Sequence, residues 1–301
     1  MSAPELGTYD VFATGDAQIL DRGYRSYDGE RRGVRGAVWA VVRHSVQRAL
    51  GMRRTLWAKL LPIFAAGIAY VPAVVFVGIV ALFKSDEATQ FVLPTYAEYY
   101  GFIIAALVVF AAIVAPEVLC TDRRSGMLGV YLASPLDRDT YLLAKAAAIA
   151  FVLSIGCLGP PLLMLVANVL QSQGPKGAGD IALTALRILG SGLLITLLFT
   201  GITMGVASLT DRKAIAAAGV LLVILVTIMV AGTLSSTNGT NSVLAIAPTA
   251  LTIELAARVH GEYSTVMPGA PSAIIWLAWA AWTFGGFALA RVQLHRLPVT
   301  R

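Results

Sequence analysis

The chain has 301 residues, of which 57% are hydrophobic and only 13% are charged, and its mean hydropathy is +0.75. An average soluble domain carries about 25% charged residues, so this composition excludes an ordinary soluble protein and indicates a helical membrane protein. The formal net charge is +6, but the arginines gather beside apolar runs. That placement indicates membrane topology and contact with anionic membrane lipid, and it argues against nucleic-acid binding.

The first part of the chain is predicted to stay outside the bilayer. Residues 1–33 are polar and read as a cytosolic tail, whereas residues 34–60 repeat apolar side chains at helical spacing between basic ones. We expect residues 34–60 to form an amphipathic helix in the membrane interface, and the alternative is a cytosolic helix that packs on a partner. The residues expected at the interface are Trp39, Arg43, Arg48, Arg53, Arg54 and Trp57.

Six apolar runs in residues 61–291 are long enough to cross a bilayer, which takes about 20 residues in a helix. The predicted spans are Leu61–Phe83, Tyr99–Leu119, Tyr141–Val169, Ile181–Leu209, Ala214–Leu234 and Ser272–Ala290. The third is interrupted by Gly159-Pro160-Pro161, so we expect a break or kink there. In the fourth, Gly201 and Gly205 allow another helix to approach closely, either within one chain or between two chains.

Basic residues set the expected orientation. They are concentrated before the first span, between spans two and three, in the turn between spans four and five, and after the last span. With six spans these segments share one side, so both termini, including the tail 292–301, are predicted to be cytosolic. The extracytoplasmic segment 235–271 contains a helix-like run, read either as a re-entrant helix covered by protein or as a surface helix. Glu254 and Arg258 within it are spaced to pair.

The loop 121–140 between spans two and three has an unusual pattern for a cytoplasmic connection. Charges at its start give way to a short apolar helix over residues 127–133, which Pro135 ends. An apolar helix in water is costly unless it is buried, so we expect it to bury itself in lipid headgroups or in a groove on a soluble partner.

This loop resembles the cytoplasmic loop of ABC-2 type exporter permeases. The run "DRRSGMLGVYLASPLDRDTYLLAK" and the acidic residue before it match the family pattern, although Met127 stands where the family often has Thr. The resemblance implies an all-α membrane protein with the ABC-2 (type V exporter-like) fold, and a coupling helix that sits on an ATPase subunit. The matching or expected coupling residues are Glu117, Arg123, Arg124, Gly126, Leu128, Tyr131, Leu132, Ser134, Pro135, Arg138 and Lys145.

Nothing in the sequence predicts ATP binding or catalysis in this chain. No G-x-x-x-x-G-K-[ST] motif occurs, and the histidines, His44, His260 and His295, fall in separate segments, so we expect no catalytic or metal site. We therefore expect no cofactor in this chain and Mg-ATP on a partner. The expected assembly has two ABC ATPase subunits and a second permease protomer, identical or related, in the cytoplasmic (inner) membrane of a prokaryotic cell.

Two other functions are compatible with this sequence. An ion- or proton-coupled secondary transporter usually places ionisable groups in mid-membrane, whereas Glu117 and Lys145 lie near span ends. A non-transporting scaffold subunit would not need the short apolar helix in the loop 121–140. The apolar character of the spans favours a hydrophobic or amphipathic substrate, such as a drug-like molecule, a natural product or a lipid.

Overall fold

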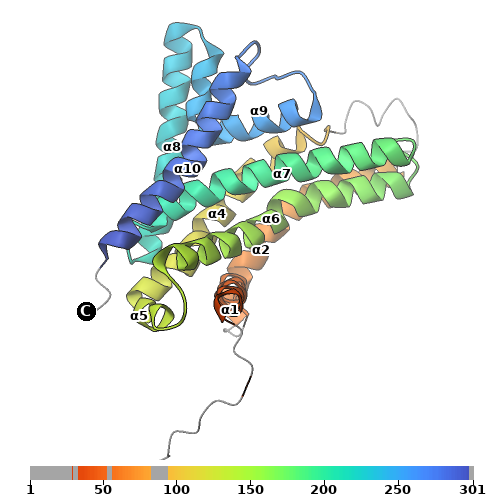
Figure 1. The fold of residues 1–301 in the computed structure, drawn as a ribbon. Helices are drawn as coiled ribbons and strands as arrows, with labels where there is room; N and C mark the ends of the chain where they lie inside the picture. Colours follow the sequence, from red (N-terminus) through yellow and green to blue (C-terminus); the bar gives the residue numbers. More distant parts are fainter. Residues whose placement is uncertain (1–28, 30–32, 53–55, 83–93, 298–301) are drawn as a thin grey trace, which may run out of the picture. The chain divides into compact units, whose positions relative to one another are not determined.

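The computed structural model describes residue 29 and residues 33–52, 56–82 and 94–297; the side chains of 56–59, 61, 62, 65 and 238 also lie outside the description. The described residues fold into helices (Figure 1). Their bounds are α1 Gly33–Ala49, α2 Leu56–Leu82, α4 Tyr99–Arg124, α5 Met127–Leu132, α6 Arg138–Leu170, α7 Ala178–Ala207, α8 Lys213–Asn238, η2 Asn241–Ile246, α9 Pro248–His260 and α10 Ser272–Arg296.

The prediction of an all-helical membrane protein is confirmed. Among the described residues, five helices are long and apolar enough to cross a membrane, namely α4, α6, α7, α8 and α10. The first predicted span falls in α2. The apolar stretch described in this helix is Ala66–Leu82, which is shorter than the five helices counted above. One end of the bundle holds α1, α5 and the last residues of α10, and it is called here the loop end (Figure 1). The helix α9 lies at the other end, which is called the α9 end.

The amphipathic helix is shorter than the sequence predicts. The helix α1 ends at Ala49, and a separate helix, α2, begins at Leu56. Gly51 has a φ of +68°, a conformation that interrupts a right-handed helix and that glycine adopts without steric cost. The helix α1 buries Val41 and Ser45 with Ala49, at a spacing of four residues, so one face of it packs on the rest of the chain.

Of the break or kink expected in the third span, the break is wrong, because α6 continues through Pro160 and Pro161 as one helix. Pro161 has no N–H to donate to the carbonyl of Cys157, four residues earlier. The hydroxyl of Tyr100 on α4 donates to that carbonyl instead, at 3.1 Å. A neighbouring helix thus satisfies the carbonyl that the proline leaves without its usual donor, which lets α6 stay continuous.

The helices α7 and α10 approach each other closely at glycines. A side chain at Gly201 would lie 2.5 Å from the carbonyl oxygen of Thr283, and one at Gly286 would lie 2.1 Å from the carbonyl oxygen of Gly201. One at Gly205 would lie 3.0 Å from Cα of Gly286. The pair Gly201 and Gly205 therefore packs against α10 of the same chain, which is the first of the two arrangements expected for it.

At the α9 end, the segment between α8 and α10 is largely covered by protein. Leu251 and Leu255 of α9 are 0% exposed and belong to a hydrophobic cluster with residues of α7 and α10. Glu254 and Arg258 pair as their spacing predicts, at 2.6 Å. The hydroxyl of Ser191 on α7 lies 3.4 Å from Nε2 of His260, so α9 is also joined to α7 by a neutral contact.

Candidate coupling site

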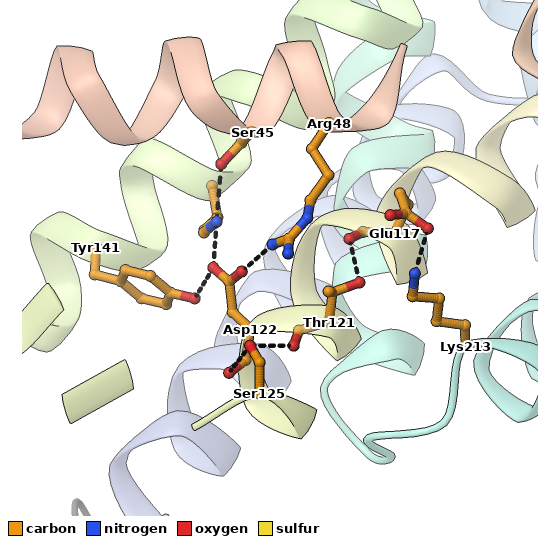
Figure 2. A network of polar contacts seen from close by, with 9 residues as sticks. Ser45, Arg48, Glu117, Thr121, Asp122, Ser125, Tyr141 and Lys213 are labelled. Carbon is orange, nitrogen blue, oxygen red and sulfur yellow. Dashed lines mark hydrogen bonds and ion pairs between the residues drawn. The ribbon is translucent and has the colours of Figure 1, made fainter. Parts of the chain in front are cut away.

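Asp122, in the last turn of α4, is the centre of a buried ionic cluster (Figure 2). Its side chain is 0% exposed, and one carboxylate oxygen accepts a hydrogen bond from the guanidinium group of Arg48 on α1 at 2.5 Å. The other oxygen lies 2.5 Å from Nζ of Lys145 on α6. One carboxylate therefore joins three helices, α1, α4 and α6, at the loop end.

Hydroxyl groups and aromatic rings complete the surroundings of this cluster. The hydroxyl of Tyr141 donates to Asp122 at 3.1 Å, and Nζ of Lys145 donates to the hydroxyl of Ser45 at 2.8 Å. Nζ of Lys145 also lies 5.3 Å from the ring centre of Tyr131 and 5.4 Å from that of Tyr141, within range of cation–π attraction. The buried charges are thus paired and hydrogen-bonded, as charges inside a protein must be.

The short helix α5 follows directly after this cluster. Gly126, before its first residue, has a φ of +67°, which favours glycine, and this turn aims α5 back onto the chain. Leu128 is 8% exposed, and the Tyr131 ring packs on that of Tyr141 with 5.5 Å between centres. Burial, and then the negative charge of Asp122, raise the pKa of Tyr131 above its usual value, so its phenol stays neutral.

The structure corrects the expectation that α5 buries its apolar residues in lipid or in a partner. Leu128 and Tyr131 pack on the chain itself, and Leu132 is half-buried against the same core. One face of α5 is not covered by the rest of the chain. The large apolar side chain on this face is Val130, which is 63% exposed. A partner that contacts α5 would therefore meet Val130 rather than Leu128.

Two basic residues of the loop bind the carbonyl ends of other helices. The guanidinium group of Arg123 donates to the carbonyls of Ser208 and Thr210, just after α7. That of Arg138 donates to three carbonyls at the end of α10, at distances between 2.5 and 3.1 Å, those of Leu294, His295 and Leu297. The last carbonyls of a helix have no partner within it and carry partial negative charge, so these arginines stabilise both helix ends.

The remaining residues predicted for the loop lie around this centre without joining it. Glu117 on α4 pairs with Lys213, the first residue of α8, at 2.6 Å. Arg124, Gly126 and Pro135 are exposed. The loop 121–140 and the helix turn before it therefore contact α1, α6, the α7–α8 turn and α10, which are far apart in the sequence.

The residues predicted for the membrane interface separate into different environments. Trp39 is 66% exposed and Arg43 is exposed four residues later, so both lie on the open face of α1. Arg48 instead turns toward Asp122. Trp57 is in α2 rather than in α1, and Arg53 and Arg54 lie outside the described residues.

Sequence reasoning missed three members of the ionic cluster: Asp122, Ser45 and Tyr141. Asp122 stands beside Arg123 and Arg124 and looks like one more charge at a membrane edge. The available signal was Lys145, a basic residue about two turns inside an apolar helix, which requires a nearby anion when it is buried. In the part of the chain that the structure describes, no group of three or more His, Cys, Asp and Glu side chains is placed to hold a metal ion.

The layout of this site can be compared with known families. A family model described as ABC-2 family transporter protein matches residues 21–285, which is most of the chain. The chain belongs to this ABC-2 family. A comparison with curated protein sequences found no match.

Membership of the ABC-2 family identifies the chain as a multi-pass transporter permease. Permeases of this family are transmembrane components that are not themselves catalytic, and they generally work with an ABC ATPase. The ABC-2 permease described here thus has, at its loop end, a buried ionic cluster that joins α1, α4 and α6, and the short helix α5 follows directly after it.

Proposed function

We propose that the chain is the permease subunit of an ATP-driven exporter that moves a hydrophobic or amphipathic compound out of the cytoplasm. The observation that supports this most is the attachment of the loop 121–140. Asp122 binds α1 and α6, Arg123 binds the end of α7, and Arg138 binds the end of α10. A force applied to this loop would reach all of these helices, and the buried ion pairs of Asp122 alone cost several kcal/mol to break.

In this mechanism a separate ATPase subunit contacts the exposed face of α5. Val130 is its large exposed apolar side chain, and Arg124 and Ser125 are exposed beside it. Closure of the ATPase pair on ATP pushes α5, and the loop end moves as a unit because its charges stay paired. The helices then separate at the other end, where no ion pair among the described residues joins two different helices, and a pathway opens outward.

The proposed assembly contains two permease chains, identical or related, and two ATPase subunits that carry Mg-ATP. Each permease has six spans in the cytoplasmic membrane of a prokaryotic cell, with both termini cytosolic. The side chains that the spans expose are large and apolar, for example Leu222 and Met229 on α8 and Leu277 on α10. A pathway between two such surfaces suits an apolar or amphipathic compound better than a bare ion.

The test is a charge placed on the exposed face of α5. In the variant Val130→Asp we expect the ATPase to be lost from the complex purified in mild detergent, because a buried unpaired carboxylate is costly at an interface. We expect ATP-dependent movement of a fluorescent amphipathic dye across inverted vesicles to fall to background. Val34→Asp is the matched control, since Val34 is similarly exposed, at 47%, but lies on α1.

Two results would count against the proposal. Full ATPase binding and full dye movement with Val130→Asp would show that α5 is not the contact. Dye movement that needs a proton gradient and not ATP would identify an ion-coupled transporter instead. The variant Leu128→Asp is unsuitable for this test, because Leu128 is buried in the chain's own core.

A further inference from the structure

A groove of about 630 Å³ opens between α6, α7 and α10, close to the loop end. Its walls follow one stripe of α6, from Asp139 to Ala150, and one stripe of α10, from Phe284 to Arg291. Small side chains such as Ala147 and Ala288 line it and leave it hollow, and its other lining residues are almost all apolar. Its volume is in the range of about 300–1,000 Å³ that is typical of sites for small ligands.

The length of this groove matches one leaflet of a bilayer. From Asp139 to Ala150 the helix advances eleven residues, which is about 16 Å at about 1.5 Å per residue. The hydrocarbon core of a bilayer is about 30 Å thick, so the apolar part of this groove, called here the slot, spans about half of it. A single acyl chain that begins at the headgroup level would therefore run along the whole slot.

The groove ends at charged residues on its loop side. Nε and Nη2 of Arg291 donate to the carboxylate of Asp139 at 2.9 and 2.8 Å, and Nε2 of His295 lies 3.1 Å from the same carboxylate. The third nitrogen of the guanidinium group, Nη1, has no acceptor among the described residues, and the Arg291 side chain is 62% exposed.

Positive charge predominates at this mouth. The start of α6, with its N-cap residue, and the end of α10 together carry three arginines, Arg138, Arg291 and Arg296, against two carboxylates, Asp137 and Asp139. An anion at the headgroup level would therefore be attracted to the same place where the apolar slot begins.

We propose that this groove binds an anionic phospholipid, with one acyl chain in the slot and its phosphate hydrogen-bonded to Arg291. The slot supplies apolar burial over the depth of one leaflet, and the mouth supplies the charge that selects the headgroup. A neutral apolar compound would fill the slot but would leave the excess positive charge of the arginines at the mouth without an anion. On the proposed topology this lipid comes from the cytoplasmic leaflet, but the site itself does not depend on ATP or on transport.

The experiment uses the full chain, purified in micelles that contain equal amounts of phosphatidylglycerol and phosphatidylcholine with identical acyl chains. Native mass spectrometry counts the lipids that stay bound, and we expect phosphatidylglycerol to be retained in preference. In Arg291→Gln this preference should fall roughly fivefold, which corresponds to about 1 kcal/mol for one arginine near a lipid surface. Arg212→Gln is the matched control, because Arg212 is an exposed arginine in the α7–α8 turn.

A second variant tests the slot independently of the charge. Ala147→Phe fills the groove and should reduce retention of phosphatidylglycerol, whereas Ala218→Phe, at an exposed alanine of α8, should not. Equal retention of the two lipids by the unmodified chain would overturn the proposal. So would a phosphatidylglycerol preference in Arg291→Gln or Ala147→Phe that equals that of its control.

A cysteine at position 147 distinguishes a lipid from a second copy of the chain in this groove. The two native cysteines, Cys120 and Cys157, are buried, so a bifunctional maleimide reports on the new thiol of Ala147→Cys. Efficient linkage of two chains would identify the groove as a chain–chain interface and would overturn the lipid site. We expect the chain to stay unlinked.

Discussion

The loop end and the α9 end both bury ionisable side chains, but they pair them in different ways. At the loop end, charges join helices that are distant in sequence, since Arg48 and Asp122 are 74 residues apart and Glu117 and Lys213 are 96 residues apart. At the α9 end, the buried Glu254 pairs only four residues away, within its own helix. Among the described residues, the links between helices there are hydrogen bonds and not ion pairs, such as those from Tyr100 to a carbonyl of α6 and from Arg258 on α9 to the hydroxyl of Ser272 on α10.

This difference indicates which end of the permease holds together when the helices move. A buried ion pair is costly to separate, because each partner then stays buried as an unpaired charge. A hydrogen bond contributes about 0.5–1.5 kcal/mol, or about 1.5–3 kcal/mol when one partner is charged, and it is exchanged for another more readily than a buried ion pair. The loop end is therefore suited to act as a rigid unit, and the α9 end is suited to open.

The largest effect is expected at Asp122. Asp122→Leu leaves Lys145 buried without its anion, so the free energy of unfolding should fall by about 3–5 kcal/mol. The measurement is denaturant unfolding of the purified chain in mixed micelles, followed by tryptophan fluorescence.

The double variant Asp122→Leu/Lys145→Met provides the control for this prediction. It removes both buried charges, and because apolar replacement of a buried pair is often close to neutral, much of the loss should be regained. Arg48 is 20% exposed and can turn its charge toward water. If the double variant is as unstable as Asp122→Leu, the unpaired lysine is not the cause.

Much of the fold could be predicted from the sequence, because apolar runs and basic clusters are local signals. The helices α4, α6, α7, α8 and α10 and the position of the short helix α5 were all predictable in this way. The continuity of α6 was not, since it depends on the hydroxyl of Tyr100, 57 residues before Cys157. A local rule about proline cannot include such a partner.

The coupling site was predictable as a place but not as a geometry. The motif located Lys145 and the loop, but no local pattern shows that Arg48 reaches Asp122 or that Ser45 reaches Lys145. The direction of α5 was equally hidden. Leu128 and Val130 are both apolar, and their residue types do not indicate that the first is buried and the second exposed.

An intermediate effect is expected at the α9 end and depends on pH. Burial, and then the positive charge of Arg187 on α7, lower the pKa of His260 from 6.5 to about 4. As the pH falls below 6.5, the unfolded chain takes up a proton that the folded chain excludes, so stability decreases until about pH 4 and then levels off.

This proton linkage can be measured with His260→Gln. Between pH 7 and pH 5 the unmodified chain should lose at most about 2 kcal/mol of stability, and His260→Gln should lose correspondingly less. Ser191 and the ring of Tyr96, which face His260, do not titrate in this range. An identical pH slope for both proteins would show that another group is responsible.

The smallest effect is expected for an ion pair that is at the loop end but in contact with water. Asp139 pairs with Arg291 through two hydrogen bonds, yet their side chains are 46% and 62% exposed. Exposed pairs contribute little to stability because water and salt screen them, so Asp139→Asn should reduce stability only slightly in neutral micelles, far less than Asp122→Leu does. Because salt screens exposed charges far more than buried ones, this small loss should shrink further in high salt, whereas the loss in Asp122→Leu should persist. A loss in Asp139→Asn as large as that in Asp122→Leu would mean that charge pairing at the loop end matters wherever it occurs, and not because Asp122 is buried.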